Sequence, residues 1–115
     1  MRGDDFRIGV RFGTMADAGA DDALLIEGDA PAERAAVAYF SLPLRVAWHP
    51  PGCACCAPRG PAAVALARLF LARARGELPW FRSVVAVTRT SAGADAVRAA
   101  LAEDVLTAAR FRKDD

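Results

Sequence analysis

The sequence predicts an α/β fold, with a small and mainly parallel sheet of three to four strands flanked by helices. Three strand-like apolar runs indicate the sheet, and alanine- and leucine-rich runs between and after them indicate the helices. The chain has 115 residues, the size of one domain, so residues 1–115 are expected to share one core. Its hydrophobic content of 54% excludes a disordered chain.

The first strand is predicted over Phe6 to Phe12, where apolar residues alternate with Arg7, Gly9 and Arg11. Such a strand has one covered side and one side in water. A strand covered by helices on both sides would be apolar throughout, so the two arginines indicate that one helical layer is missing. Residues 13–22 are expected to form a loop.

The next two segments are predicted as helices. A short helix is expected over Asp22 to Glu27, and another begins near Asp29 with Pro31 in its first turn. The run Ala35 to Phe40 fits either a continuation of that second helix or a strand, and the helix is the preferred interpretation.

Proline and glycine mark the boundaries in the middle of the chain. A second strand is predicted over Leu44 to His49, and the prolines that follow must end it because they have no N–H to donate to a sheet. A helix follows over Ala62 to Ala74, introduced by Gly60-Pro61 and ended by Gly76. The third strand is expected over Ser83 to Thr88. Helices are then expected over residues 94–101 and 104–111, and residues 112–115 as a solvated charged tail.

The residues with the most distinctive chemistry are the three cysteines, Cys53, Cys55 and Cys56, which closely follow the only histidine, His49. Thiolates are soft metal ligands, and three of them with an imidazole make a tetrahedral zinc set. The spacing is unusual for zinc because one short loop supplies every thiolate, and the alternative is three small buried hydrophobic side chains. In the predicted order this loop follows the carboxyl end of a strand and precedes a helix, which is where open α/β sheets bind ligands.

The segment Gly52-Cys53-Ala54-Cys55-Cys56, with Arg59, resembles the Gly-Cys-x-Cys-Cys-x-x-Arg motif of the CobW-type GTPases, a family of P-loop metallochaperones. The run Val84 to Thr88 is similar to the next strand of that family. The resemblance implies a single CobW-like domain, reduced from a P-loop GTPase. No Gly-x-x-x-x-Gly-Lys-Ser/Thr motif is present and the only lysine is Lys113, so no nucleotide is expected to bind. Thr14 and Val87 replace acidic residues of the family, so the protein is not expected to be an enzyme.

Together these features favour a non-catalytic, CobW-like protein that stores, senses or delivers a transition metal. Zinc is the expected metal, with cobalt or another transition metal as alternatives, and Cys53, Cys55 and Cys56 are the expected ligands. Either His49 or a loop carboxylate such as Asp17 would complete the set. The alternative function is a nucleotide-free interaction module that pairs with itself or with a full-length CobW-type GTPase, its cysteines being structural. A thiol redox protein is disfavoured because cysteines this close form strained disulfides.

The composition bears on the partners. Fifteen basic and 14 acidic residues are interspersed and give a net charge of +1, so neither nucleic acid nor an anionic membrane is an expected partner. The N-terminus lacks an apolar signal region, and the most apolar run, Ala62 to Ala74, is too short to span a bilayer. A cytoplasmic location is therefore expected, where the cysteines would be reduced. A homodimer is expected because a small sheet leaves two edges, and Trp48, Trp80 and Phe81 add apolar surface.

Overall fold

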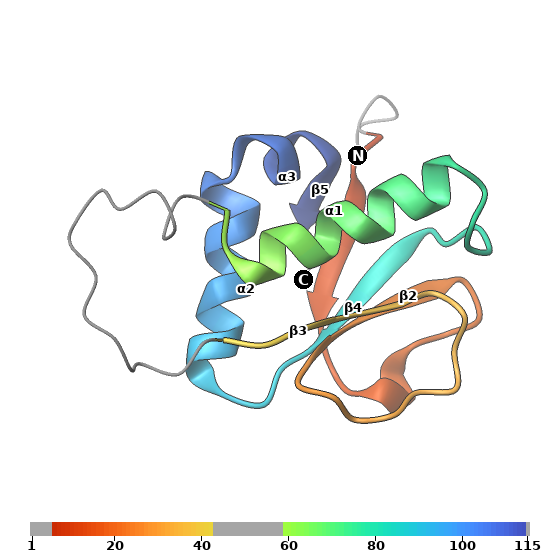
Figure 1. The fold of residues 1–115 in the computed structure, drawn as a ribbon, viewed down its shortest axis with the longest axis horizontal. Helices are drawn as coiled ribbons and strands as arrows, with labels where there is room; N and C mark the ends of the chain where they lie inside the picture. The colour runs from red at the N-terminus through yellow and green to blue at the C-terminus, as the bar shows by residue number, and fades with distance from the viewer. Residues whose placement is uncertain (1–5, 43–58, 115) are drawn as a thin grey trace.

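The computed structural model describes residues 6–42 and 59–114. Within these ranges five parallel strands form one sheet in the order β3-β2-β4-β1-β5 (Figure 1). The α/β class and the parallel sheet are confirmed, but the expected three to four strands were too few. The elements are β1 (Ile8–Phe12), the 3-10 helix η1 (Met15–Asp17), β2 (Asp22–Glu27), β3 (Val37–Phe40), α1 (Pro61–Ala74), β4 (Ser83–Val87), α2 (Ser91–Glu103), α3 (Val105–Arg110) and β5 (Phe111–Lys113).

The two faces of the sheet are covered differently. Helices α1 and α2 bury one face, where Val10, Leu25 and Val84 belong to the main core. Helix α3 lies against α1, α2 and β5. On the opposite face a smaller cluster of Leu24, Ile26 and Val85 packs against residues of η1 and of the loop between β2 and β3. In the described part of the chain, a 3-10 helix and a loop therefore cover the face on which the sequence predicted a missing helical layer.

The first predicted strand is confirmed as β1. Ile8 and Val10 are buried on the helical side, while Arg7 is exposed and Arg11 is half-buried. β1 pairs with β4 on one side and with β5 on the other. The alternation of side chains thus reflects a strand whose two faces meet different surroundings.

The helix predicted over Asp22 to Glu27 is wrong, because these residues form strand β2. Residues 23–27 are all buried, and β2 pairs with β4 and β3. A strand that is buried on both faces loses the polar positions that would reveal a period of two, so its short apolar run has no distinguishing pattern.

The second helix, predicted to begin near Asp29, is also wrong, and of the two interpretations of Ala35 to Phe40 the strand is correct and the preferred helix is not. Residues 28–36 contain neither helix nor strand, and Val37–Phe40 form strand β3 beside β2. Gly28 starts the loop with a φ of 105°, a backbone conformation that residues other than glycine rarely adopt. The side chain of Arg34 donates hydrogen bonds to the carbonyl oxygens of Ala18, Gly19 and Asp22, which hold the loop against the start of β2.

The predicted helix over Ala62 to Ala74 is confirmed as α1. Gly60 is its N-cap, Pro61 its first residue, and Gly76 follows its end with a φ of 74°. After the turn, Phe81 is only 1% exposed and belongs to the core, so it does not add to the apolar surface as expected. Trp80 is 67% exposed and lies under the guanidinium of Arg73 at 3.9 Å. The predicted strand Leu44 to His49, with Trp48, lies outside the described residues.

The third strand and the two C-terminal helices are confirmed as β4, α2 and α3. The prediction of a tail over residues 112–115 is wrong for Arg112 and Lys113, which belong to β5 and pair with β1. Phe111, predicted as the end of the last helix, begins this strand and is only 1% exposed. Within residues 6–42 and 59–114, no helix has the length and hydropathy needed to cross a membrane.

Candidate functional site

The cysteine segment connects β3 to α1. His49, Cys53, Cys55 and Cys56 lie outside the described residues, so only the two ends of the connection are placed. β3 ends at the edge formed by the carboxyl ends of the parallel strands, near the start of α2, whereas Arg59, just before α1, lies at the other end of α2 (Figure 1). The chain that carries the cysteines therefore leaves at the edge where α/β sheets bind ligands and returns beside the end of α2.

Arg59, the arginine that follows the cysteines, is held at the end of α2 by a bidentate ion pair. Its Nε lies 3.1 Å from Asp104 Oδ1, and its Nη2 lies 2.8 Å from Asp104 Oδ2. Asp104 is also the N-cap of α3, since its Oδ2 accepts hydrogen bonds from N and Oγ1 of Thr107. The hydrogen bonds from Arg59 and Thr107 hold the pKa of Asp104 well below its usual range. The exit of the cysteine segment is thus fixed to the α2–α3 junction.

A cleft of about 520 Å³ lies beside this ion pair. It is formed by the first turn of α1, the end of α2 and the start of α3. Its walls are mostly small apolar side chains, with Arg59, Glu103 and Asp104 as the charged ones; the lining residues are Arg59, Gly60, Ala62, Ala63, Ala96, Ala99, Ala100, Glu103, Asp104, Val105 and Leu106. On its rim Val105 is 81% and Leu106 47% exposed.

A buried carboxylate, that of Glu27, occupies the carboxyl end of β2. Its side chain is on the helical side of the sheet and only 6% of the residue is exposed. Oε1 accepts hydrogen bonds from the backbone N–H groups of Arg89, at 2.6 Å, and Thr90, at 3.0 Å. Oε2 accepts one from the hydroxyl of Thr90 at 2.7 Å. Burial alone would raise the pKa of Glu27, but these hydrogen bonds outweigh burial and lower the pKa.

The sequence analysis did not identify Glu27 as a site residue. This omission follows from the wrong prediction of a helix over residues 22–27. In a helix, Glu27 would not stand at the carboxyl end of a strand, where ligands bind. Once the run is known to be a strand, Glu27 shares a face with Ala23 and Leu25 and stands at the carboxyl end. A second signal was the Thr90-x-x-Gly93 start of α2, where Thr90 is the N-cap and accepts a hydrogen bond from the N–H of Gly93.

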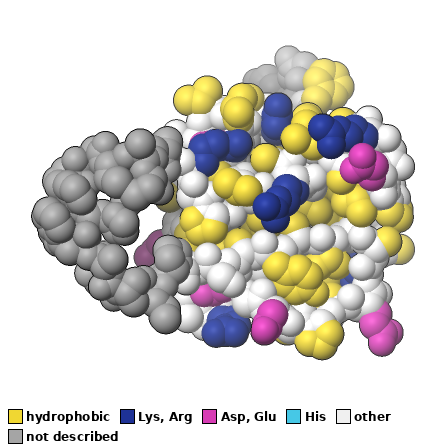
Figure 2. Space-filling view, viewed as in Figure 1, with side chains coloured by type: hydrophobic (Ala, Val, Ile, Leu, Met, Phe, Trp, Pro, Cys, Tyr) yellow, Lys and Arg dark blue, Asp and Glu magenta, His cyan; other side chains and the backbone are white. Residues whose placement is uncertain are grey.

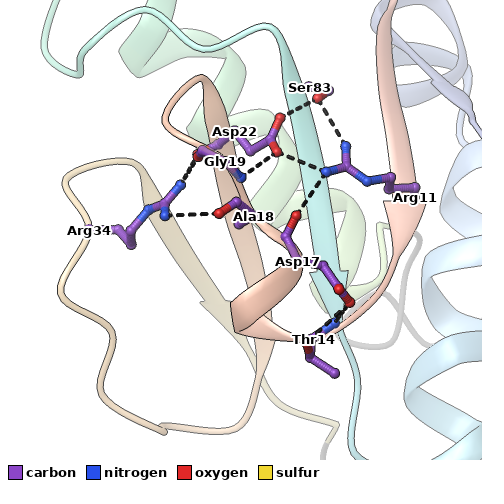
Figure 3. Close-up of polar contacts among 8 residues, drawn as sticks. All are labelled: Arg11, Thr14, Asp17, Ala18, Gly19, Asp22, Arg34 and Ser83. Atoms are coloured by element: carbon purple, nitrogen blue, oxygen red, sulfur yellow. Dashed lines mark hydrogen bonds and ion pairs between the residues drawn. The ribbon is translucent and has the colours of Figure 1, made fainter.

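A second polar network lies on the opposite face of the sheet (Figure 3). Asp22 Oδ2 is 2.8 Å from Arg11 Nη2, and Asp22 Oδ1 accepts a hydrogen bond from the hydroxyl of Ser83 at 2.5 Å. Burial opposes ionisation of Asp22, but the hydrogen bonds from Arg11, Ser83 and the N–H of Gly19 prevail and lower its pKa to about 2. A carboxylate with so low a pKa is a poor general base at neutral pH.

Asp17, the loop carboxylate considered as a metal ligand, is engaged in hydrogen bonds within its own loop. Asp17 Oδ2 accepts hydrogen bonds from the N–H of Thr14, at 2.7 Å, and from its hydroxyl, at 3.1 Å (Figure 3). These bonds cap η1 and lower the pKa of Asp17. Asp22 belongs to the network with Arg11. Both carboxylates therefore stabilise local structure, as aspartates in turns commonly do.

Within residues 6–42 and 59–114, no group of three or more His, Cys, Asp or Glu side chains lies close enough together to hold a metal ion. Comparisons with protein-family models, with curated proteins and with solved structures gave no match to this chain.

Proposed function

We propose that this protein binds a transition metal, with zinc as the expected ion, through Cys53, Cys55 and Cys56, and that it stores, senses or delivers that metal without catalysing a reaction. The observation that carries the proposal is the fixed exit of the cysteine segment. Arg59 follows Cys56 by three positions and is tied by two hydrogen bonds to Asp104. An anchored end reduces the conformational entropy that three thiolates must lose to converge on one ion.

The start of α1 adds a favourable field. The first turn, Pro61 to Ala63, contains no acidic side chain, and its N-cap is glycine. The positive end of the helix dipole therefore lies close along the chain to the cysteines, and such a position favours the thiolate over the thiol. Thiolate is the form that binds zinc and cobalt.

The fourth ligand in this proposal is His49. The carboxylate of Asp17, the competing candidate, already accepts two hydrogen bonds from Thr14. Both bonds are accepted by Oδ2, and they fix the position of this carboxylate at η1. The resemblance to the CobW-type family is part of the same proposal, with Arg59 as the arginine of the shared motif, and so is the absence of nucleotide binding.

A cobalt titration tests the proposal. Under reducing conditions the wild type is expected to take up about one Co²⁺ per chain and to show thiolate-to-cobalt charge-transfer bands in the near ultraviolet. Cys55→Ser with Cys56→Ser should abolish the bands, and His49→Ala should weaken binding. Asp17→Asn is the matched control for the fourth ligand and should leave the affinity unchanged. A wild type without these bands, or cysteine variants that retain them, would overturn the proposal.

The second candidate function is an interaction module, and the cleft beside α3 favours it. Val105 and Leu106 are exposed next to the alanine-lined hollow. Figure 2 shows further hydrophobic side chains between basic ones over the face that carries α1. A homodimer, or a pair with a full-length CobW-type GTPase, would cover such a surface, and the outer strands β3 and β5 offer edges for pairing.

Light scattering on the wild type and on Leu106→Asp separates the two candidate functions. A dimer that depends on bound metal should dissociate when chelator is added. A dimer formed through the cleft should be unaffected by chelator and should dissociate in the Leu106→Asp variant. Ser91→Asp, at an exposed position in the first turn of α2, changes the charge by the same amount and is the control. A wild type that is a monomer of 12.2 kDa both with and without chelator would rule out self-pairing.

A further inference from the structure

The groups around Glu27 form a binding cradle for an anion. Two backbone N–H groups and one hydroxyl, from Arg89 and Thr90, converge on one carboxylate at 2.6 to 3.0 Å. They belong to the connection between β4 and α2, at the carboxyl end of the central strand. In α/β folds, phosphate and carboxylate groups of ligands are held by such N–H groups at this place.

Gly93 shapes the floor of the cradle. It is buried in the first turn of α2, and a Cβ added to it would overlap the carboxylate of Glu27. The close approach of the carboxylate therefore depends on glycine at this position. The positive charge of Arg89 also favours the ionised form of Glu27.

We propose that Glu27 is a built-in anion that fills the ligand position of this sheet and keeps it closed to phosphate and carboxylate ligands. The cradle suits a single anionic group with two or three acceptor oxygens. In the native chain that anionic group is the carboxylate of Glu27. Because it is attached to β2, its effective concentration at the cradle is higher than that of a free anion in solution. The closure is permanent under ordinary conditions, since the carboxylate is buried and takes part in three hydrogen bonds.

This inference is independent of the metal proposal, because it concerns α2 and β2 and no thiolate. It adds a structural reason for the expected absence of nucleotide binding. The P-loop lysine is missing, and the N–H groups just before α2, at the carboxyl end of the central strand, already bind the side chain of Glu27.

The test removes the internal anion and adds a free one. Inorganic phosphate is titrated at constant ionic strength into the wild type, Glu27→Ala and Glu27→Gln, and the backbone N–H signals of Arg89 and Thr90 are followed by NMR. Glu27→Ala is expected to show saturable shifts at these two residues and a melting temperature that rises with phosphate. The wild type and Glu27→Gln, whose side chain still fills the space, are expected to show neither.

Two results would overturn the inference. One is a folded Glu27→Ala variant whose Arg89 and Thr90 signals ignore phosphate, and the other is a wild type that responds as strongly as the variant. If Glu27→Ala is unfolded in buffer alone, phosphate or acetate should restore its native signals. Failure of both anions to do so, while Glu27→Gln remains folded, would also count against the inference.

Discussion

Replacing Gly93 by alanine should destabilise the fold although alanine is the better helix former. In an open helix this substitution stabilises by about 1 kcal/mol. Here the added methyl group would overlap the carboxylate of Glu27, which must then leave its three hydrogen-bond donors. With a net loss of about 1 to 1.5 kcal/mol per hydrogen bond, the loss is about 3 to 4 kcal/mol.

The net effect expected for Gly93→Ala is a loss of about 2 to 3 kcal/mol in the free energy of unfolding. For a domain of this size that corresponds to a fall of about 10 °C in melting temperature. Gly60→Ala is the matched control, because a Cβ at Gly60 has no heavy atom within 4 Å among those described. As an N-cap, alanine is poorer than glycine, so this control should lose at most about 1 kcal/mol.

A double-mutant cycle measured by urea unfolding checks the mechanism. In a Glu27→Ala background the carboxylate is gone, and Gly93→Ala should there be neutral or stabilising by up to about 1 kcal/mol. The expected coupling between the two positions is therefore about 3 kcal/mol. If Gly93→Ala lowers stability equally in both backgrounds, the contact with Glu27 is not the cause and the reasoning fails.

Three further outcomes are expected. Because the pKa of Asp22 is lowered to about 2 from 3.8, its contribution to stability is complete above pH 4 and is lost as the pH falls towards 2. Asp22→Asn should therefore lower the free energy of unfolding in urea by roughly 2 kcal/mol at pH 6, and the difference from the wild type should vanish near pH 2; a constant difference across this range would contradict the assignment. Phe111→Ala should lower stability by about 3 to 5 kcal/mol, whereas Val105→Ala, at an 81% exposed position, should change it by about 0.5 kcal/mol or less, and similar losses would argue against β5 as a core strand. Asp104→Asn keeps a capping side chain on α3 but removes the ion pair with Arg59, so it should lower the melting temperature and also weaken cobalt binding to the folded protein several-fold; an unchanged affinity would show that the anchor does not assist the cysteines.

The features that were predicted correctly depend on neighbours in the sequence. The alternation in β1 and the Gly60-Pro61 start and Gly76 end of α1 are local patterns, and the structure contains both elements. β2 was misassigned because its identity as a strand depends on pairing with β4 and β3, which are distant in the chain. β5 was missed for the same reason, since a three-residue strand in a charged segment is recognisable only beside β1.

The candidate site shows the same dependence on neighbours in the sequence, and the metal-binding role of the cysteines stays a prediction. The cysteines were recognised because their chemistry is visible in the residues themselves. The role of Glu27 was not visible, because its hydrogen-bond donors follow 62 and 63 positions later. A carboxylate at the end of an apolar run becomes informative only when the run is known to be a central strand.

The order of the strands has a consequence for how the chain can fold. β1 and β2 follow one another in the sequence but do not pair, because β4 lies between them, and both neighbours of β1 come from the half of the chain after α1. Of the described strands, the first half contributes only the pair β2–β3. Neither half should therefore form this sheet alone, and two fragments divided in the turn between α1 and β4 should acquire structure only when mixed, which is the behaviour expected of a fold dominated by contacts between distant residues.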